Sequence, residues 1–137
     1  MRVAFGSDEG TPIADEVAAA LSAAGHELVL RIEDAPWPDV GRRVGELVAA
    51  GEADRGIVCC WTGTGVSIAA NKVPGVRAAL CTDAETARGA RRWNDANVLA
   101  IGLRLTTPAT AVEMLDAFLG TEADAGEAAN IAKVTHG

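Results

Sequence analysis

The chain has 137 residues, of which 49% are hydrophobic, so it can form one packed domain over residues 1–137, and its apolar runs fall short of the ~20 residues of a membrane span. Its formal net charge of −7 argues against nucleic acids and anionic membranes as partners, because both bind through Lys and Arg. Its three cysteines, Cys59, Cys60 and Cys81, lack the even number of a disulfide framework and the spacing of a zinc site, so we expect a cytoplasmic protein with reduced thiols and no metal.

Short apolar stretches alternate with helical patterns about five times along the chain, which indicates a parallel sheet covered by helices. Most of these stretches are apolar on both faces, as expected for strands buried on both sides. The predicted fold class is therefore α/β, with a doubly wound, Rossmann-like sheet of five parallel strands in a three-layer αβα arrangement. The predicted strands cover residues 3–5, 27–32, 56–60, 77–81 and 98–101.

Capping residues and glycines delimit the predicted helices. A threonine followed by proline begins the first and the fifth, and Thr82 with Glu85 forms a capping box for the fourth. The helices are predicted to begin at Thr11–Pro12, at Asp39, inside the turn 63–65, at Thr82 and at Thr107–Pro108, and a last one covers about residues 126–134.

The turn from Trp61 to Gly65 joins the third strand to the third helix. Gly63 and Gly65 flank Thr64 there, and such a turn directs several backbone N–H groups and a helix N-terminus at one small volume, which suits an anion or a developing oxyanion. Alternatively, the glycines only allow a tight turn. Position 68 is Ile where a dinucleotide-binding motif has its third glycine, so we expect no nucleotide cofactor.

Cys60 ends the third strand, and strand alternation turns it to the face opposite Cys59. A thiolate is favoured beside a helix N-terminus, so Cys60 is a candidate general base or nucleophile. The alternative is a buried cysteine that only packs.

Two further turns carry polar candidates, and we expect them to line the same crevice as the glycine turn. Asp8 and Glu9 follow the first strand, where their carboxylates could contact sugar hydroxyls, although Asp8 could instead cap the next segment. Asn94 follows the fourth helix and is either a site residue or a helix C-cap. His26 and His136 are not placed like an acid, a base or a metal ligand.

Several segments taken together form a specific pattern. They are residues 3–8 (VAFGSD), 37–39 (WPD), 51–57 (GEADRGI), 60–76 (with SIAANKVPG at 67–75), 77–81 (RAALC) and 94–99 (NDANVL). The combination resembles the type B ribose-5-phosphate isomerases and their galactose-6-phosphate isomerase relatives, from the first strand to about residue 104. The resemblance implies a cofactor-independent aldose–ketose isomerase, an intramolecular oxidoreductase, that forms a homodimer or tetramer with each site built from two subunits.

Carried over to matching positions, the resemblance also implies roles for individual residues. Cys60 would be the base that moves a proton between C1 and C2 through an enediolate. Thr62 and the amides of Gly63 to Gly65 would hold the enediolate oxygen. Asp8 and Asn94 would bind substrate hydroxyls.

The departures from the family pattern concern the substrate. Glu9 stands where the family has His, and Trp93 replaces the His implicated in opening the sugar ring. The segment 125–130 lacks the Arg and His residues that hold the phosphate, and only Arg104 remains at a phosphate position. We therefore predict an isomerase of an atypical sugar or sugar phosphate rather than of ribose 5-phosphate, with Glu9, Trp93 and Arg104 among its substrate-binding residues.

Two other functions agree with the same residues. The chain could be a weakly active subunit that needs a second, different chain to supply the absent cations. It could also be a non-enzymatic carbohydrate-binding module that kept the pocket, although the retained Cys60, Thr62 and Asp8 argue against this.

Overall fold

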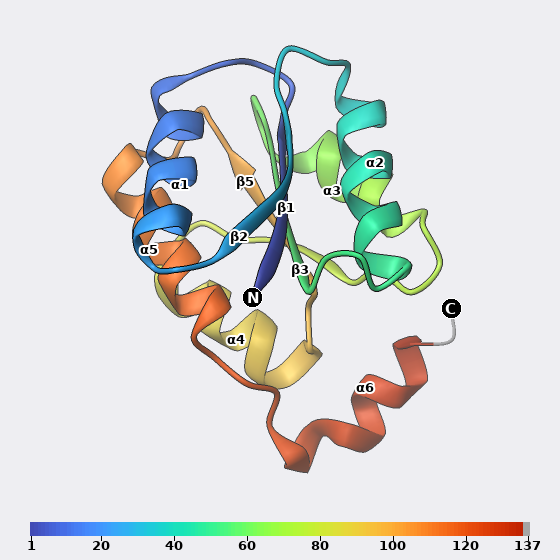
Figure 1. Ribbon diagram of the computed structural model, residues 1–137. Helices are drawn as coiled ribbons and strands as arrows, with labels where there is room; N and C mark the ends of the chain where they lie inside the picture. The colour runs from blue at the N-terminus through green and yellow to red at the C-terminus, as the bar shows by residue number, and fades with distance from the viewer. Residues whose placement is uncertain (136–137) are drawn as a thin grey trace.

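A computed structural model describes residues 1–135 and confirms the predicted α/β fold class. Five parallel strands form one sheet in the order β2-β1-β3-β5-β4 (Figure 1). Each strand is followed by a helix that returns the chain to the start of the sheet. The strands are β1 (Arg2–Ser7), β2 (Glu27–Ile32), β3 (Arg55–Cys60), β4 (Ala78–Leu80) and β5 (Val98–Gly102).

Helices lie on both faces of the sheet. The apolar sides of α2 and α3 pack on one face, and those of α1, α4 and α5 pack on the other. The last helix, α6, has no buried residue and stands apart from the sheet, below α4 in Figure 1. The helices are α1 (Pro12–Ala23), α2 (Trp37–Ala49), α3 (Thr64–Asn71), α4 (Ala84–Asn94), α5 (Pro108–Leu119) and α6 (Ala128–Thr135), the last preceded by a 3-10 turn at Ala125–Glu127.

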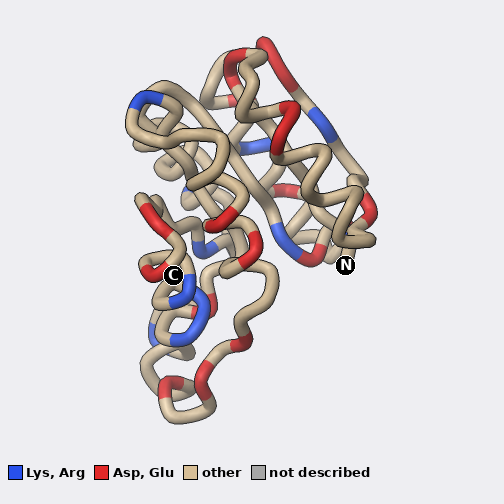
Figure 2. Tube along the Cα trace, turned by 90° about the vertical axis from the view of Figure 1, so that its left-hand side faces the viewer, with Lys and Arg blue, Asp and Glu red and all other residues tan. Residues whose placement is uncertain are grey.

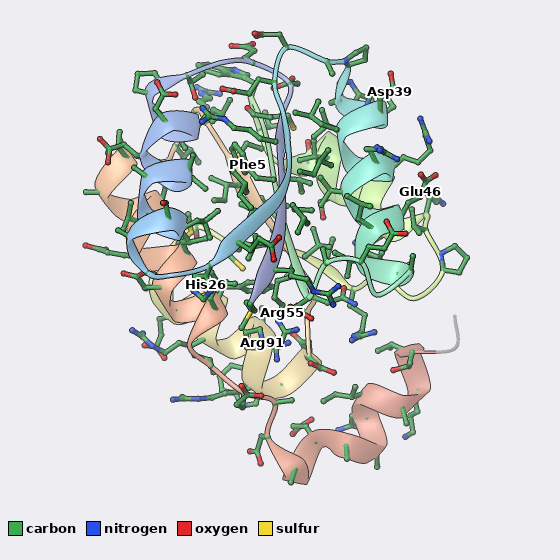
Figure 3. The ribbon with its side chains drawn as sticks, viewed as in Figure 1. Phe5, His26, Asp39, Glu46, Arg55 and Arg91 are labelled. Carbon is green, nitrogen blue, oxygen red and sulfur yellow. The ribbon has the colours of Figure 1, made fainter. Side chains whose placement is uncertain are left out.

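The hydrophobic core is divided by the sheet into two clusters. Phe5 (Figure 3) and Cys59 belong to the cluster beneath α1, α4 and α5. Cys60 belongs to the cluster beneath α2 and α3. This arrangement confirms the predicted opposite orientation of the two neighbouring thiols.

Most helix boundaries agree with the capping signals, but two predictions are wrong. The second helix begins at Trp37 rather than at Asp39, because a proline is compatible with the first turn of a helix. The fourth helix is capped by Asp83 rather than Thr82, since the Asp83 carboxylate accepts a hydrogen bond from the Thr86 amide at 2.7 Å.

The parallel strands give the sheet two chemically different edges. The connections that leave β1, β3, β4 and β5 lie at the carboxyl edge, and the ends of the helices that lead into the next strand lie at the amino edge. His26 follows α1 and lies near the amino end of β1 (Figure 3), and His136 lies outside the described residues. Within residues 1–135, every helix is too short or too polar to span a bilayer.

Candidate functional site

Asp8 and Cys60 are neighbours at the carboxyl edge of the sheet. Ser7 pairs with Cys59 in the β1–β3 ladder, and the Asp8 amide continues that ladder by donating to the Cys59 carbonyl at 3.1 Å. The next residue on each strand, Asp8 or Cys60, therefore lies at the point where the two strands end. Because β1 leads to a helix on one face and β3 to a helix on the other, this is where the connections separate and a ligand can enter.

The Asp8 carboxyl group is poorly solvated. Its Oδ1 atom is buried and has no hydrogen-bond partner among residues 1–135. Burial, and after it the negative charge of Glu9, raise the pKa of Asp8 above its ordinary value of 3.8. An incompletely paired carboxyl group at a strand end has free capacity to bind a hydroxyl group or to exchange a proton.

Gly63 gives the turn after β3 its shape. Its φ of 76° lies in the left-handed region, and a Cβ atom there would lie 2.5 Å from Leu80 Cδ1 and 2.8 Å from the Gly102 amide nitrogen. The helix α3 starts at the next residue, so the first amides of its free N-terminal turn face the carboxyl edge. The hydroxyl groups of Thr62 and Thr64 are hydrogen-bonded to each other at 2.7 Å across this turn.

Cys60 lies beneath this edge with 5% of its surface exposed, compared with 0% for Cys59 and 1% for Cys81. Burial raises the pKa of Cys59 far above its ordinary range and that of Cys81 to about 11, so both favour the neutral thiol. Cys60 is the last residue of β3, directly before the turn 61–65 and beside Asp8, whereas Cys81 lines the cavity next to that turn.

Thr62 and Arg104 line a separate cavity of about 190 Å³ beside the glycine turn, together with Trp61. The Arg104 amide donates to the Trp61 carbonyl at 2.9 Å, which fixes the connection after β5 against the connection after β3. Cys60 is not among the residues that line this cavity. The structure thus groups Arg104 with Thr62, one residue away from the glycines.

Trp93 and Asn94 lie at the other edge of the sheet, and the expectation that all three turns line one crevice is wrong. They end α4, which leads into β5 (Figure 1). Just beyond them, the Asn97 carbonyl accepts a hydrogen bond from the amide of Gly56 at the start of β3. The six residues of β3 separate that start from Cys60 by roughly 15–20 Å. Trp93 and Asn94 instead line a cavity along α4, together with Leu80 and Cys81.

Trp37 is a contact of the glycine turn that was not predicted from the sequence. A Cβ atom at Gly65 would lie 2.9 Å from the indole carbon Cδ2 of Trp37, so the indole covers the start of α3. The Trp37 side chain is 45% exposed, so part of the indole is available to contact a ligand.

Acidic and basic residues are interspersed over the molecule rather than gathered into one basic patch (Figure 2). In the described part of the chain, no group of three His, Cys, Asp or Glu residues is arranged to hold a metal ion.

In a parallel α/β sheet, small molecules bind at the carboxyl edge, and here that edge carries a thiol, a carboxyl group and an amide-lined turn. The chain belongs to the Ribose/Galactose Isomerase family, whose sequence profile matches residues 3–135. The resemblance inferred from the sequence is thereby confirmed, and with it membership in a family of cofactor-independent sugar isomerases.

Individual relatives support the same assignment. Ribose-5-phosphate isomerase B of Escherichia coli K12 is 38% identical over 130 residues, which cover 91% of this chain and 87% of that protein. D-erythrulose-4-phosphate isomerase of Pectobacterium atrosepticum is 41% identical over 97 residues, which cover 71% of this chain but only 64% of that protein. The structure of ribose-5-phosphate isomerase B from Clostridium thermocellum superposes with a TM-score of 0.92 at 40% identity, over 98% of this chain and 95% of that one.

Replacement of Gly63 by alanine tests whether the turn requires glycine. We expect Gly63→Ala to lower the free energy of unfolding by roughly 2–5 kcal/mol, from the left-handed backbone and the clash with Leu80 and Gly102 together. Gly25→Ala is the matched control, because Gly25 has a φ of 81° but no atom within 4 Å of an added Cβ. Urea denaturation should show a loss of only about 1–2 kcal/mol for the control. Equal losses would show that close packing does not constrain the turn.

Replacement of Asp8 by asparagine separates stability from activity. Since the folded-state pKa is raised, the folded chain loses stability as Asp8 ionises, between pH 3.8 and its higher folded value. Asp8→Asn should therefore raise the melting temperature at pH 7 and lose this advantage below pH 3.8, while activity falls. Glu16→Gln on the exposed side of α1 serves as the control in the same melting experiment. A lower melting temperature for Asp8→Asn at pH 7 would contradict the raised pKa of Asp8 in the folded chain.

Proposed function

We propose that the protein is a cofactor-independent aldose–ketose isomerase in which Cys60 transfers a proton between two neighbouring carbons of a hydroxy-carbonyl substrate. The observation that carries the proposal is the meeting of Cys60, Asp8 and the amides at the start of α3 at the point where β1 and β3 end. The family assignment supports the reaction class, and the particular substrate is part of the proposal.

The geometry supports a division of labour among these groups. The Cys60 thiolate removes a proton from the carbon beside the carbonyl and returns it to the neighbouring carbon. The negative charge that develops on the carbonyl oxygen is stabilised by the free amides of Gly63 to Gly65 and by the Thr62 hydroxyl. Asp8, whose Oδ1 atom is unpaired within residues 1–135, binds a substrate hydroxyl group and exchanges its proton as the carbonyl moves.

The complete site includes a second copy of the chain. Asn94 and Trp93 are exposed at the amino edge, too far from Cys60 to act in the same subunit. A homodimer that places the amino edge of one subunit against the carboxyl edge of the other brings both groups to one substrate, twice per dimer. Trp93, with 57% of its surface exposed, would then stack on the sugar.

The substrate is proposed to differ from ribose 5-phosphate. The segment 125–130, which comprises the 3-10 turn and the first residues of α6, contains no Lys, Arg or His. A charge-assisted hydrogen bond contributes ~1.5–3 kcal/mol, so the loss of two such contacts weakens phosphate binding by about two to four orders of magnitude. The substrate is therefore an unphosphorylated sugar, or one whose phosphate is bound through other residues such as Arg104.

Deuterium uptake from solvent tests the proposal on a panel of aldoses and ketoses, with and without a phosphate group. We expect exchange at the carbon beside the carbonyl for at least one member, with a lower KM than for ribose 5-phosphate. Cys60→Ala should slow deuterium exchange at least about a hundredfold but leave substrate binding intact. The control Cys59→Ala removes a thiol on the opposite face of the sheet and should retain exchange.

Three outcomes would contradict parts of this proposal. Robust turnover of ribose 5-phosphate with a low KM would remove the idea of an atypical substrate. Exchange that survives in Cys60→Ala would remove the thiol from the mechanism. Activity that appears only after a different chain from the native source is added would favour a subunit of a hetero-oligomer instead.

A further inference from the structure

Arg91 is a fully buried cation at the end of α4, with 1% of its surface exposed. Its Nη1 donates to Asp95 Oδ1 and to the Ala96 carbonyl, both at 2.7 Å, and its Nε donates to the Thr121 carbonyl at 3.0 Å. The guanidinium also lies over the Phe118 ring, 5.9 Å from its centre. One side chain thus joins the last turn of α4 to the start of β5 and to the end of α5.

Asp95 is the carboxylate that stabilises this corner of the structure, where α4, β5 and the end of α5 meet. Its φ of 47° places a non-glycine residue in the left-handed region, where a helix more often ends on glycine. The carboxylate bridges two arginines, because Oδ1 accepts from Arg91 and Oδ2 accepts from Arg77 at 3.3 Å. Arg77 Nε donates to the Asp95 carbonyl at 2.8 Å as well.

Further charged groups lie near this carboxylate: Arg55, and the carboxylates of Glu122 and Asp54 that act on it. Arg55 lies beside Arg91 at the amino edge (Figure 3), and burial followed by the charge of Arg91 lowers the pKa of Arg55. Its Nε is buried without a hydrogen-bond partner among the described residues. If the charge of Asp95 were removed, Arg77 and Arg91 would lose the carboxylate that they share, and the repulsion between Arg55 and Arg91 would be less compensated.

The exposed side of the same helical turn presents the residues assigned to the site. Trp93 and Asn94 immediately precede Asp95, and the Trp93 indole lies against Gly89, where a Cβ would be 2.7 Å from its Cζ3 atom. The tail that leads to α6 is fixed to this turn too, because the Asp124 amide donates to the Arg92 carbonyl at 2.8 Å. The buried arginine therefore fixes Trp93, Asn94 and the segment around Asp124 that precedes α6 relative to one another.

We propose that Arg91 and Asp95 are positioning residues, which act on the site of a second copy of the chain by holding Asn94 and Trp93 in the geometry that a substrate requires. This inference rests on the proposed function, in particular on the shared site. It assigns a role in the reaction to two residues that touch no substrate.

Substitution of Asp95 tests whether this residue affects the reaction. Asn and Gly both accept a left-handed backbone, so Asp95→Asn and Asp95→Gly remove the charge without adding strain. We expect kcat/KM to fall by about tenfold to a hundredfold while the circular dichroism spectrum is retained, because a small displacement of a binding group is enough. Glu46→Gln breaks the exposed Arg42–Glu46 pair on α2, 3.1 Å long, and should leave kcat/KM unchanged.

Mixed dimers distinguish positioning from general destabilisation. When Asp95→Gly and Cys60→Ala chains are co-expressed, half of the dimers contain one chain of each kind. In such a mixed dimer, one of the two sites combines the intact carboxyl edge of the Asp95→Gly chain with the intact amino edge of the Cys60→Ala chain. About a quarter of wild-type activity should therefore return. Asp95→Gly with Asn94→Ala should stay inactive, because both changes affect the same edge. Asp95→Asn, which keeps the size of the side chain, should give the same pattern.

The outcomes separate this inference from the proposed function. If Asn94→Ala with Cys60→Ala recovers activity but Asp95→Gly and Asp95→Asn with Cys60→Ala do not, Asp95 acts within its own subunit and the positioning role is overturned. If no mixture recovers activity, the shared site itself fails. Full activity of Asp95→Asn alone would also overturn the positioning role.

Discussion

All five strands run in the same direction, and this constraint determines at which edge of the sheet the polar residues of each connection lie. Residues just after a strand lie at the carboxyl edge, and residues just before a strand lie at the amino edge. Asp8, Cys60 and the glycine turn belong to the first group, and Trp93 and Asn94 belong to the second. In the proposed function, the two groups reach one small substrate by the pairing of two subunits.

The two edges are stabilised by different means. At the carboxyl edge, a left-handed glycine and close packing of backbone atoms leave no space for a side chain, so the shape comes from steric exclusion. At the amino edge, a buried arginine and an aspartate in an unusual backbone conformation fix the corner through ion pairs and hydrogen bonds. The first arrangement suits a site that stabilises charge through amides. The second suits a rigid surface presented to another subunit.

The fold was largely predictable from the sequence, because apolar stretches, capping residues and glycines are local signals. The Thr107 cap and the opposite orientation of Cys59 and Cys60 were predicted correctly, while the cap of α4 was assigned to Thr82 instead of its neighbour Asp83. The site was only partly predictable. Nothing local places Asn94 at the far edge from Cys60, covers Gly65 with Trp37 or joins Arg91 to Thr121, since these relations depend on strand order and on packing between distant segments.

The shared site requires that one substrate is held between the carboxyl edge of one subunit and the amino edge of another. A crystal structure of the protein with an unreactive analogue of the enediolate tests this requirement most directly. We expect the analogue's oxygens to contact the amides of Gly63 to Gly65, with the Cys60 sulfur beside its reacting carbons and Asn94 of the partner subunit on a hydroxyl group. An analogue enclosed by a single subunit, or bound away from Cys60, would contradict the shared site.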